Sequence, residues 1–211
     1  MKKTLLFTFL LLCTLSVSAQ VTFKPGIRAG ANFSKITNTD LDGKTDFYIS
    51  AFGALKLTRF YTMQPEIGYS RQGGEGNIVT TNYYYTDYNS YETQSVQNVD
   101  VELQYITFAL INKFTLTNNF NIHVGPTFDI ITNSSQYTYN DVDLGVTAGI
   151  GYTTPFGLGV EARVKKGFVN VVDNYYYNNQ GNDYYDYNDN ANNLVFSLGL
   201  TYSFNVTGSS K

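Results

Sequence analysis

A single stretch near the end of the chain, residues 193–204, constrains the fold more than any other. It reads N-L-V-F-S-L-G-L-T-Y-S-F, and every even position from Leu194 to Phe204 carries a large apolar or aromatic side chain. The odd positions between them are mostly small and weakly polar. Because successive side chains of an extended chain point to opposite faces, this period of two predicts a β-strand. A soluble protein would turn the bulky face to its core, whereas a barrel in a bilayer would turn it to lipid.

Further segments of the chain alternate in the same way, and each has about the 9–11 residues that a tilted membrane strand needs. Amphipathic helical periodicity with a capping residue is nearly absent. The sequence therefore predicts an all-β fold, an eight-stranded antiparallel up-and-down transmembrane β-barrel. The expected strands are 26–34, 47–57, 61–70, 101–114, 120–130, 142–152, 156–168 and 193–204.

Two of these segments are irregular. In 101–114 the apolar phase changes after Tyr105, so either a bulge resets the register or both faces of the strand are apolar there. Pro65, which lacks a backbone donor, predicts a local bulge in 61–70.

The connections between the expected strands alternate in length. Short turns at 58–60, 115–119 and 153–155 alternate with long segments at 35–46, 71–100, 131–141 and 169–192. Outer-membrane barrels combine short periplasmic turns with long extracellular loops in this way, and soluble lipocalin-like barrels lack that regular alternation.

The first long segment begins like a calcium loop, with Asn38, Asp40 and Asp42 before Gly43. Its twelfth position is Ile49 in place of the glutamate that a calcium loop requires. We therefore expect a polar hairpin loop with its turn at Asp42-Gly43, and no metal site.

Charged and polar side chains fall on the face opposite the bulky residues in most segments. An eight-stranded barrel has room inside only for side chains, so these groups predict an ion-paired network that fills the lumen. The alternative is a soluble barrel with the apolar face inside. The expected network consists of Arg28, Glu66, Glu102, His123, Asp129, Glu161, Arg163 and Lys165.

The start of the chain resembles a secretory signal. Residues 1–19 combine Lys2 and Lys3 with a short apolar run and the small-residue site Val17-Ser18-Ala19. We expect a signal peptide at 1–19, a barrel domain at 20–205 and a tail at 206–211. The single cysteine, Cys13, would be removed with the signal peptide. The net charge of −3 does not indicate a basic surface for nucleic acid. We expect the barrel to be a monomer that contacts outer-membrane lipid and holds no cofactor.

Several motifs, in order, resemble the PorT-type outer-membrane β-barrel family of Gram-negative bacteria. They are G-I-R-A-G-A-N-F-S (26–34), Q-P-E-I-G-Y-S (64–70), L-Q-Y-I-T-F (103–108), H-V-G-P (123–126), A-G-I-G (148–151), E-A-R-V-K-K-G (161–167) and L-G-L-T-Y-S-F (198–204). The resemblance covers about 20–204 and implies an eight-stranded barrel in the cell outer membrane, reached after export to the periplasm. It implies little about function.

Two of the long segments are rich in tyrosine, which is the strongest functional indication. Tyrosine among small polar residues forms adaptable contact surfaces, so these segments predict extracellular binding of a glycan or a protein. The alternative is an interfacial aromatic belt, which Tyr and Phe must supply because tryptophan is absent. The tyrosines are Tyr83, Tyr84, Tyr85, Tyr88 and Tyr91 in the first segment, and Tyr175, Tyr176, Tyr177, Tyr184, Tyr185 and Tyr187 in the second.

We predict a non-enzymatic structural or surface-interaction protein. One alternative is an outer-membrane enzyme, of the lipid acyltransferase or protease type, which would need His123, Ser70 and Asp129 within hydrogen-bond reach. Another is a narrow pore or small-ligand carrier.

Overall fold

The computed structural model describes residues 21–39, 41–85, 90–117, 119–134, 140–171 and 191–205. Eight strands account for nearly all of them. Within these residues, no helix combines the length and the apolar character needed to cross a membrane. The strands are β1 (Thr22–Ile36), β2 (Asp42–Lys56), β3 (Tyr61–Tyr85), β4 (Ser90–Thr115), β5 (Phe120–Ser134), β6 (Val142–Thr153), β7 (Leu158–Gly167) and β8 (Asn193–Ser203).

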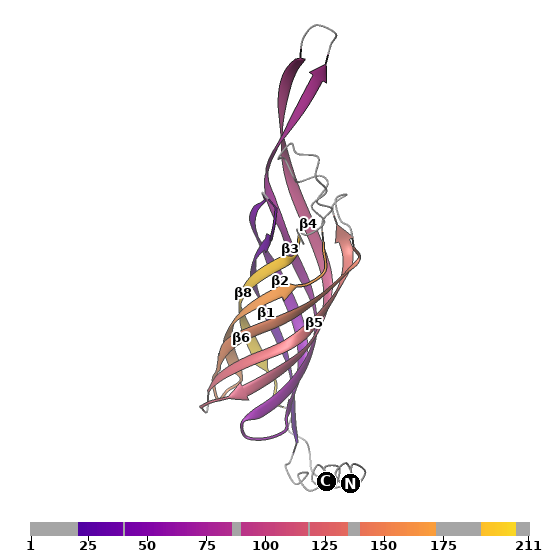
Figure 1. Cartoon of the computed structure of the whole chain (residues 1–211). Coiled ribbons are helices and arrows are strands. Elements are labelled where there is room, and N and C mark those ends of the chain that lie inside the picture. The colour runs from indigo at the N-terminus through magenta and orange to yellow at the C-terminus, as the bar shows by residue number, and fades with distance from the viewer. Residues whose placement is uncertain are drawn as a thin grey trace, which may run out of the picture.

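The strands close into one antiparallel barrel in sequence order (Figure 1). β1 pairs with β2 and also with β8, from Gly26 opposite Ser203 to Ile36 opposite Asn193. This closure confirms the predicted eight-stranded up-and-down barrel. We call the end with the turns at 57–60, 116–119 and 154–157 the turn end. The opposite end, where β3 and β4 continue as a long hairpin described below, is the arm end.

The bulky face of each strand lies on the outside of the barrel. In β8 and just after it, the even positions from Leu194 to Phe204 are 37% to 58% exposed, whereas Val195 and Thr201 are buried. The distance from Leu194 to Phe204 is about 33 Å along the strand, or about 25 Å along the axis at the usual tilt. That height matches the apolar band of a membrane barrel, and an exposed band of this kind is incompatible with the soluble alternative.

Aromatic side chains occupy both borders of the band, as interfacial aromatics do in membrane barrels. At the turn end, the rings of Tyr61 and Phe114 lie 5.4 Å apart and those of Tyr202 and Phe204 lie 5.1 Å apart. At the arm end, ring pairs form between Phe33 and Phe196 at 6.1 Å and between Phe47 and Tyr69 at 6.0 Å.

Strands β3 and β4 continue far beyond the other strands. Their pairing is unbroken from Tyr61 opposite Phe114 to Tyr85 opposite Ser90. The ladder of β2 with β3 ends at Glu75, and that of β4 with β5 ends at Leu103. Most of the expected loop 71–100 is therefore a two-stranded hairpin, which we call the arm (76–99). Nine residue steps, from Gly76 to Tyr85, place the described end of the arm about 30 Å beyond the barrel. Figure 1 shows β3 and β4 extending well past the other strands.

Two local expectations are wrong. The turn between β1 and β2 was expected at Asp42-Gly43, but both residues already belong to β2. The positive φ (59°) in this connection is that of Asn38. Pro65 pairs with Leu110 without a register shift. The irregularities lie between Gly43 and Tyr48 of β2, and beside Gln104 and Tyr105 of β4, where Thr132 is the extra residue of β5.

Candidate functional site: the lumen, its apolar cap and the arm

The middle of the lumen holds a network of buried ion pairs centred on Arg163 of β7. Its guanidinium makes two hydrogen bonds to the carboxylate of Glu66 on β3, each 2.8 Å long. It also donates to Glu161 Oε2 at 2.7 Å. Such fork-to-fork geometry is the strongest form of the arginine–carboxylate contact.

Glu161 is the point where these charges meet. Its carboxylate forms ion pairs with Arg163 and with Lys113 of β4, and it lies 3.3 Å from Arg28 Nε of β1. Its side chain is fully buried, so the three cations replace the solvation that burial removes. Arg28 also lies over the ring of Tyr48, at 4.1 Å from its centroid.

A second buried pair lies closer to the arm end, between Lys165 of β7 and Asp129 of β5. Lys165 Nζ is 5.6 Å from the ring centroid of Tyr105. His123 Nδ1 is 3.1 Å from Asn121 Oδ1, and Asn121 in turn donates to the Gly151 carbonyl. We call this set the ionic level. Its charged members are Arg28, Lys113, Arg163 and Lys165 with Glu66, Asp129, Asp143 and Glu161, equal numbers of the two signs.

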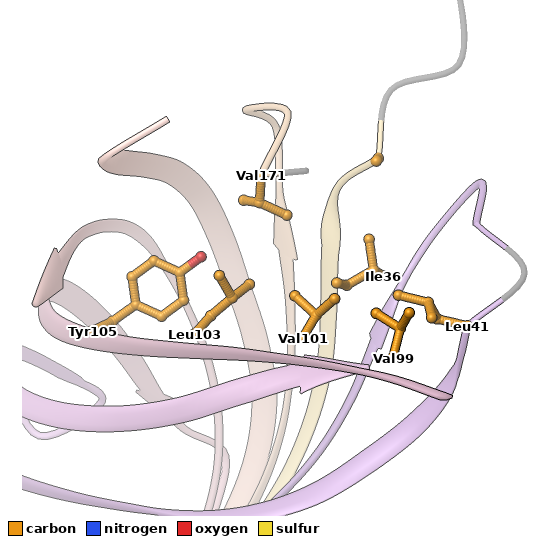
Figure 2. Packing of buried hydrophobic residues seen from close by; sticks show 8 residues of the cluster. Ile36, Leu41, Val99, Val101, Leu103, Tyr105 and Val171 are labelled. Atoms are coloured by element: carbon orange, nitrogen blue, oxygen red, sulfur yellow. The ribbon is translucent and has the colours of Figure 1, made fainter. Parts of the chain in front are cut away.

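Towards the arm end the lumen changes from polar to apolar. Figure 2 shows Val99, Val101, Leu103 and Tyr105 pointing from β4 to one side, together with the side chains of Ile36, Leu41 and Val171. We call this cluster the apolar cap. It consists of Ile36, Leu41, Val99, Val101, Leu103, Tyr105, Val171 and Ala191, all buried, with Ile131 packed against it.

The cap settles the two interpretations of 101–114. Pairing with β3 runs through this segment without a shift, so the odd positions of β4 from Val101 to Lys113 point inward. Leu103 and Tyr105 are inward and fully buried, while Phe108 and Leu110 are exposed on the outside. Both faces of β4 are therefore apolar, each over a different part of the strand, and no bulge resets β4 against β3.

The expectation that Glu102 joins the lumen network is wrong. Glu102 occupies an even, outward position, and its side chain is 34% exposed. It forms an ion pair with Arg71 and accepts a hydrogen bond of 2.8 Å from Gln104. Its two neighbours with the same odd–even phase, Gln104 and Ile106, also point outward. Alternation alone could not tell which phase of β4 faced the lumen.

Glu102 belongs instead to a polar network on the outside of β2, β3 and β4. Arg71 Nε lies 3.2 Å from Asp46, and Lys44 pairs with Asp100. Tyr69 Oη donates to Gln104 Oε1 at 2.8 Å. We call this set the outer polar network: Lys44, Asp46, Tyr69, Arg71, Asp100, Glu102 and Gln104. It lies just beyond the aromatic pair Phe47–Tyr69, where the apolar band ends on this wall.

The ionic level leaves a small cavity in the lumen, about 60 Å³ in volume. Arg28, Tyr48, Thr127 and Lys165 are among its lining residues. Among the described residues, Tyr48 Oη and Thr127 Oγ1 have no hydrogen-bond partner. A polar space of this size holds about four or five water molecules, so it is suited to internal hydration.

The described residues do not assemble a catalytic triad. Ser70 Oγ accepts hydrogen bonds from Asn32 and Gln72, His123 contacts Asn121, and Asp129 pairs with Lys165. No hydrogen bond joins Ser70, His123 and Asp129 to one another in this part of the chain. The same residues contain no group of three or more metal-ligating side chains.

The tyrosines of the first segment lie on the arm as far as the backbone is described. Tyr83, Tyr84 and Tyr85 end β3, and Tyr91 is opposite Tyr84 on β4. Outside the described residues lie Tyr88 and the second group, Tyr175, Tyr176, Tyr177, Tyr184, Tyr185 and Tyr187.

Sequence reasoning missed two functional members of the lumen. Lys113 and Ile111 both occupy odd positions of β4. Because Phe108 and Leu110, at even positions, point outward, alternation places Lys113 inside the lumen. Tyr48 is inward and buried, and it approaches β8 where that strand has Gly199. A Cβ at Gly199 would lie 1.8 Å from Tyr48 Oη, which is why only glycine fits opposite this tyrosine.

A closed eight-stranded barrel with an apolar outer band and a filled lumen defines a small transmembrane β-barrel protein. No family model matches the chain, and no curated protein matches it. Among solved structures it is similar to Neisserial surface protein A (NspA), at 14% identity over 88% of this chain and 100% of that chain, with a TM-score of 0.48.

Two further solved structures show a comparable likeness. Ail, the attachment invasion locus protein of Yersinia pestis, is 10% identical over 86% of this chain and 97% of its own, with a TM-score of 0.45. The outer membrane protein OprG from Pseudomonas aeruginosa is 8% identical over 87% of this chain and 95% of its own, with a TM-score of 0.43. The assignment to the barrel class rests on the strand order and the exposed band of this chain itself.

Proposed function

We propose that this chain is a non-enzymatic outer-membrane protein of the PorT type that binds a glycan or a protein at the cell surface. The arm and the tyrosine-rich segment 172–190 would carry the binding, and the barrel would hold them in the membrane. In this proposal the arm end faces the outside of the cell and the turn end faces the periplasm. Residues 1–19 would direct export before the barrel inserts.

The position of the arm is the observation that carries this proposal. Continuous pairing of β3 with β4 places the backbone of Tyr83, Tyr84, Tyr85 and Tyr91 about 23–30 Å beyond the barrel. Interfacial aromatics lie at the border of the hydrocarbon, and the pairs Phe33–Phe196 and Phe47–Tyr69 already occupy that border. The arm tyrosines are too far out for a membrane belt, which favours a binding surface.

The lumen supports a binding role over transport. The apolar cap and the ionic level fill successive parts of the lumen with buried side chains, and the cavity within the ionic level has a volume of about 60 Å³. A pore for solutes needs a continuous wet path, and a cap of fully buried Leu103, Val101 and Ile36 interrupts one. We therefore expect no stable conductance from the barrel in planar bilayers.

Removing the arm tests the proposal with the barrel intact. Asn77 is opposite Asn98, so residues 78–97 can be replaced by an Asn-Gly turn that preserves the ladder. The full chain and the shortened chain would be reconstituted in nanodiscs and applied to arrays of glycans and of surface proteins. We expect specific retention of the full chain, and at least about tenfold weaker retention of the shortened chain, because rigid aromatic anchors carry most of an interface's affinity.

Two controls decide the outcome. Phe substitution of Tyr61 and Tyr202, which are tyrosines of the turn end, should leave retention unchanged. Equal retention of the full and shortened chains would contradict a binding role for the arm. Protease digestion of intact cells provides the orientation: cleavage within 78–97 is expected, whereas cleavage confined to the 116–119 turn would reverse it.

A further inference from the structure

Two lysines flank one leucine on the outside of the barrel at its arm end. Leu194 of β8 is opposite Lys35 of β1 on one side and opposite Lys166 of β7 on the other. All three occupy outward positions, so the two lysine Cα atoms lie two strand spacings apart, about 10 Å. The pair thus forms a short basic row across three neighbouring strands.

In the part of the chain that the structure describes, neither lysine takes part in an ion pair. Lys166 Nζ donates to Thr37 Oγ1 at 2.9 Å, and Thr37 is itself held by two hydrogen bonds to the Asn192 carbonyl. Lys166 is therefore oriented towards β1 in advance, and Lys35 is exposed to the surroundings.

The surface below the row is apolar and continuous with the membrane band. Phe33 and Phe196 lie two residues closer to the band than Lys35 and Leu194, and their rings are 6.1 Å apart. Aromatic side chains of this kind mark the border between the hydrocarbon and the lipid headgroups. The two ammonium groups are thus at headgroup height, with acyl-chain contacts directly beneath them.

The opposite wall at the same end is different. There, Lys44 pairs with Asp100, and Arg71 lies between Asp46 and Glu102. The cations of that wall are neutralised within the protein, whereas Lys35 and Lys166 have no ion pair among the described residues. A ligand with negative charge at headgroup height therefore complements the wall formed by β7, β8 and β1 better than the wall formed by β2, β3 and β4.

We propose that Lys35 and Lys166, with Leu194 between them, bind the phosphate of an anionic lipid headgroup in the leaflet at the arm end. The acyl chains of the same lipid lie on Phe33 and Phe196. This site is independent of any ligand of the arm, so its test does not depend on whether the arm binds a glycan or a protein.

Native mass spectrometry of the full chain tests the site. The protein is released from nanodiscs that contain equal fractions of phosphatidylglycerol, which is anionic, and phosphatidylcholine, whose phosphate is balanced by its own cation. Each lysine near a lipid surface strengthens anionic binding by about fivefold. We therefore expect retained phosphatidylglycerol to exceed phosphatidylcholine by about tenfold or more in the unaltered chain.

Matched variants assign the preference to this wall. The double variant Lys35→Gln and Lys166→Gln should lose it, and Lys35→Gln alone should lose about fivefold. The control, Lys24→Gln with Lys56→Gln, removes the same charge near the turn end and should keep the preference. All four side chains lie at strand ends, outside the buried ionic level, so the barrel should fold in each case.

Three results would overturn the proposal. The preference could persist in the double variant, or the turn-end control could lose as much as the arm-end variant. The third is displacement of phosphatidylglycerol by inorganic phosphate at an equal concentration, which would identify an ion site in place of a lipid site.

Discussion

Two parts of strand β4 differ in what they turn to the lumen and to the outside. From Thr107 to Lys113, the inward positions are Thr107, Ala109, the buried Ile111 and Lys113, whose ammonium joins the ionic level, while Phe108 and Leu110 point outward. From Val99 to Tyr105, the inward positions are apolar while Glu102 and Gln104 point outward into the outer polar network. The strand keeps one register with β3 throughout, so the change lies in the surroundings and not in the backbone.

This difference shows where the membrane ends. Beside lipid, apolar side chains are stable outside and charged ones must be inside and paired. Beyond the lipid, water covers the outer surface, and the usual arrangement of a soluble protein returns, with the apolar residues inside. The inversion between Tyr105 and Ile106 therefore marks the border of the hydrocarbon on this wall.

Neutralising Glu161 should have the largest effect, because it breaks the ionic level at the point where three cations meet. Glu161→Gln leaves Arg28, Lys113 and Arg163 with too little negative charge in a buried site. We expect the free energy of unfolding to fall by about 3–5 kcal/mol. Urea unfolding in lipid vesicles, followed by gel mobility, measures it.

The exposed residue Glu75 provides the control for this change. Glu75→Gln should alter the free energy of unfolding by less than about 0.5 kcal/mol. Equal effects at Glu75 and Glu161 would mean that the ionic level contributes no specific stability.

Truncating the apolar cap tests the other side of the comparison. Leu103→Ala opens a cavity among buried side chains, and we expect a loss of about 2–4 kcal/mol in the same unfolding assay. Leu110→Ala on the outer face of the same strand should cost less, because lipid fills the space. If the Leu110 variant proves the more destabilised of the two, the cap is not a packed core.

The boundary between the two levels should show an intermediate sensitivity. Asp129→Asn removes the charged partner of Lys165, and we expect a loss of about 1.5–3 kcal/mol. Lys165 retains its contact with the ring of Tyr105, which limits the loss. Adding Tyr105→Leu to Asp129→Asn should therefore cost more than the sum of the two single changes; simple additivity would show that the ring does not support the lysine.

Salt should distinguish buried ion pairs from exposed ones with the smallest effect of all. Raising NaCl from about 0.05 M to about 0.5 M screens exposed charges but hardly affects buried ones. The contribution of Lys44–Asp100, measured by a double-mutant cycle, should fall towards zero, while that of Arg163–Glu66 should stay constant. A strong salt dependence of the Arg163–Glu66 coupling would indicate that water reaches the ionic level.

The barrel itself could be predicted from the sequence because alternation in β5, β6 and β8 is regular and each of these strands lies beside lipid over most of its length. Two features could not. Alternation predicts that the apolar residues of 101–105 face lipid, because the sequence does not show that this part of β4 lies beyond the membrane. Glu102, on the other face of the strand, was therefore placed in the lumen. The arm was expected as a loop because its many Thr, Asn, Gln and Tyr residues lack an apolar face, although its Thr and Tyr residues favour strands.

The most direct test of the inversion is a spin-label scan of β4. The only cysteine of the chain is Cys13, so labels at positions 102 to 110 can be placed singly once 1–19 is removed. Collision rates with oxygen, which enters lipid, and with a water-soluble nickel chelate would be measured in vesicles. We predict that positions 106, 108 and 110 respond to oxygen, that 102 and 104 respond to the chelate, and that 103 and 105 respond to neither. Oxygen-rich, chelate-poor environments at 102 and 104 would contradict a membrane border at Tyr105 and Ile106.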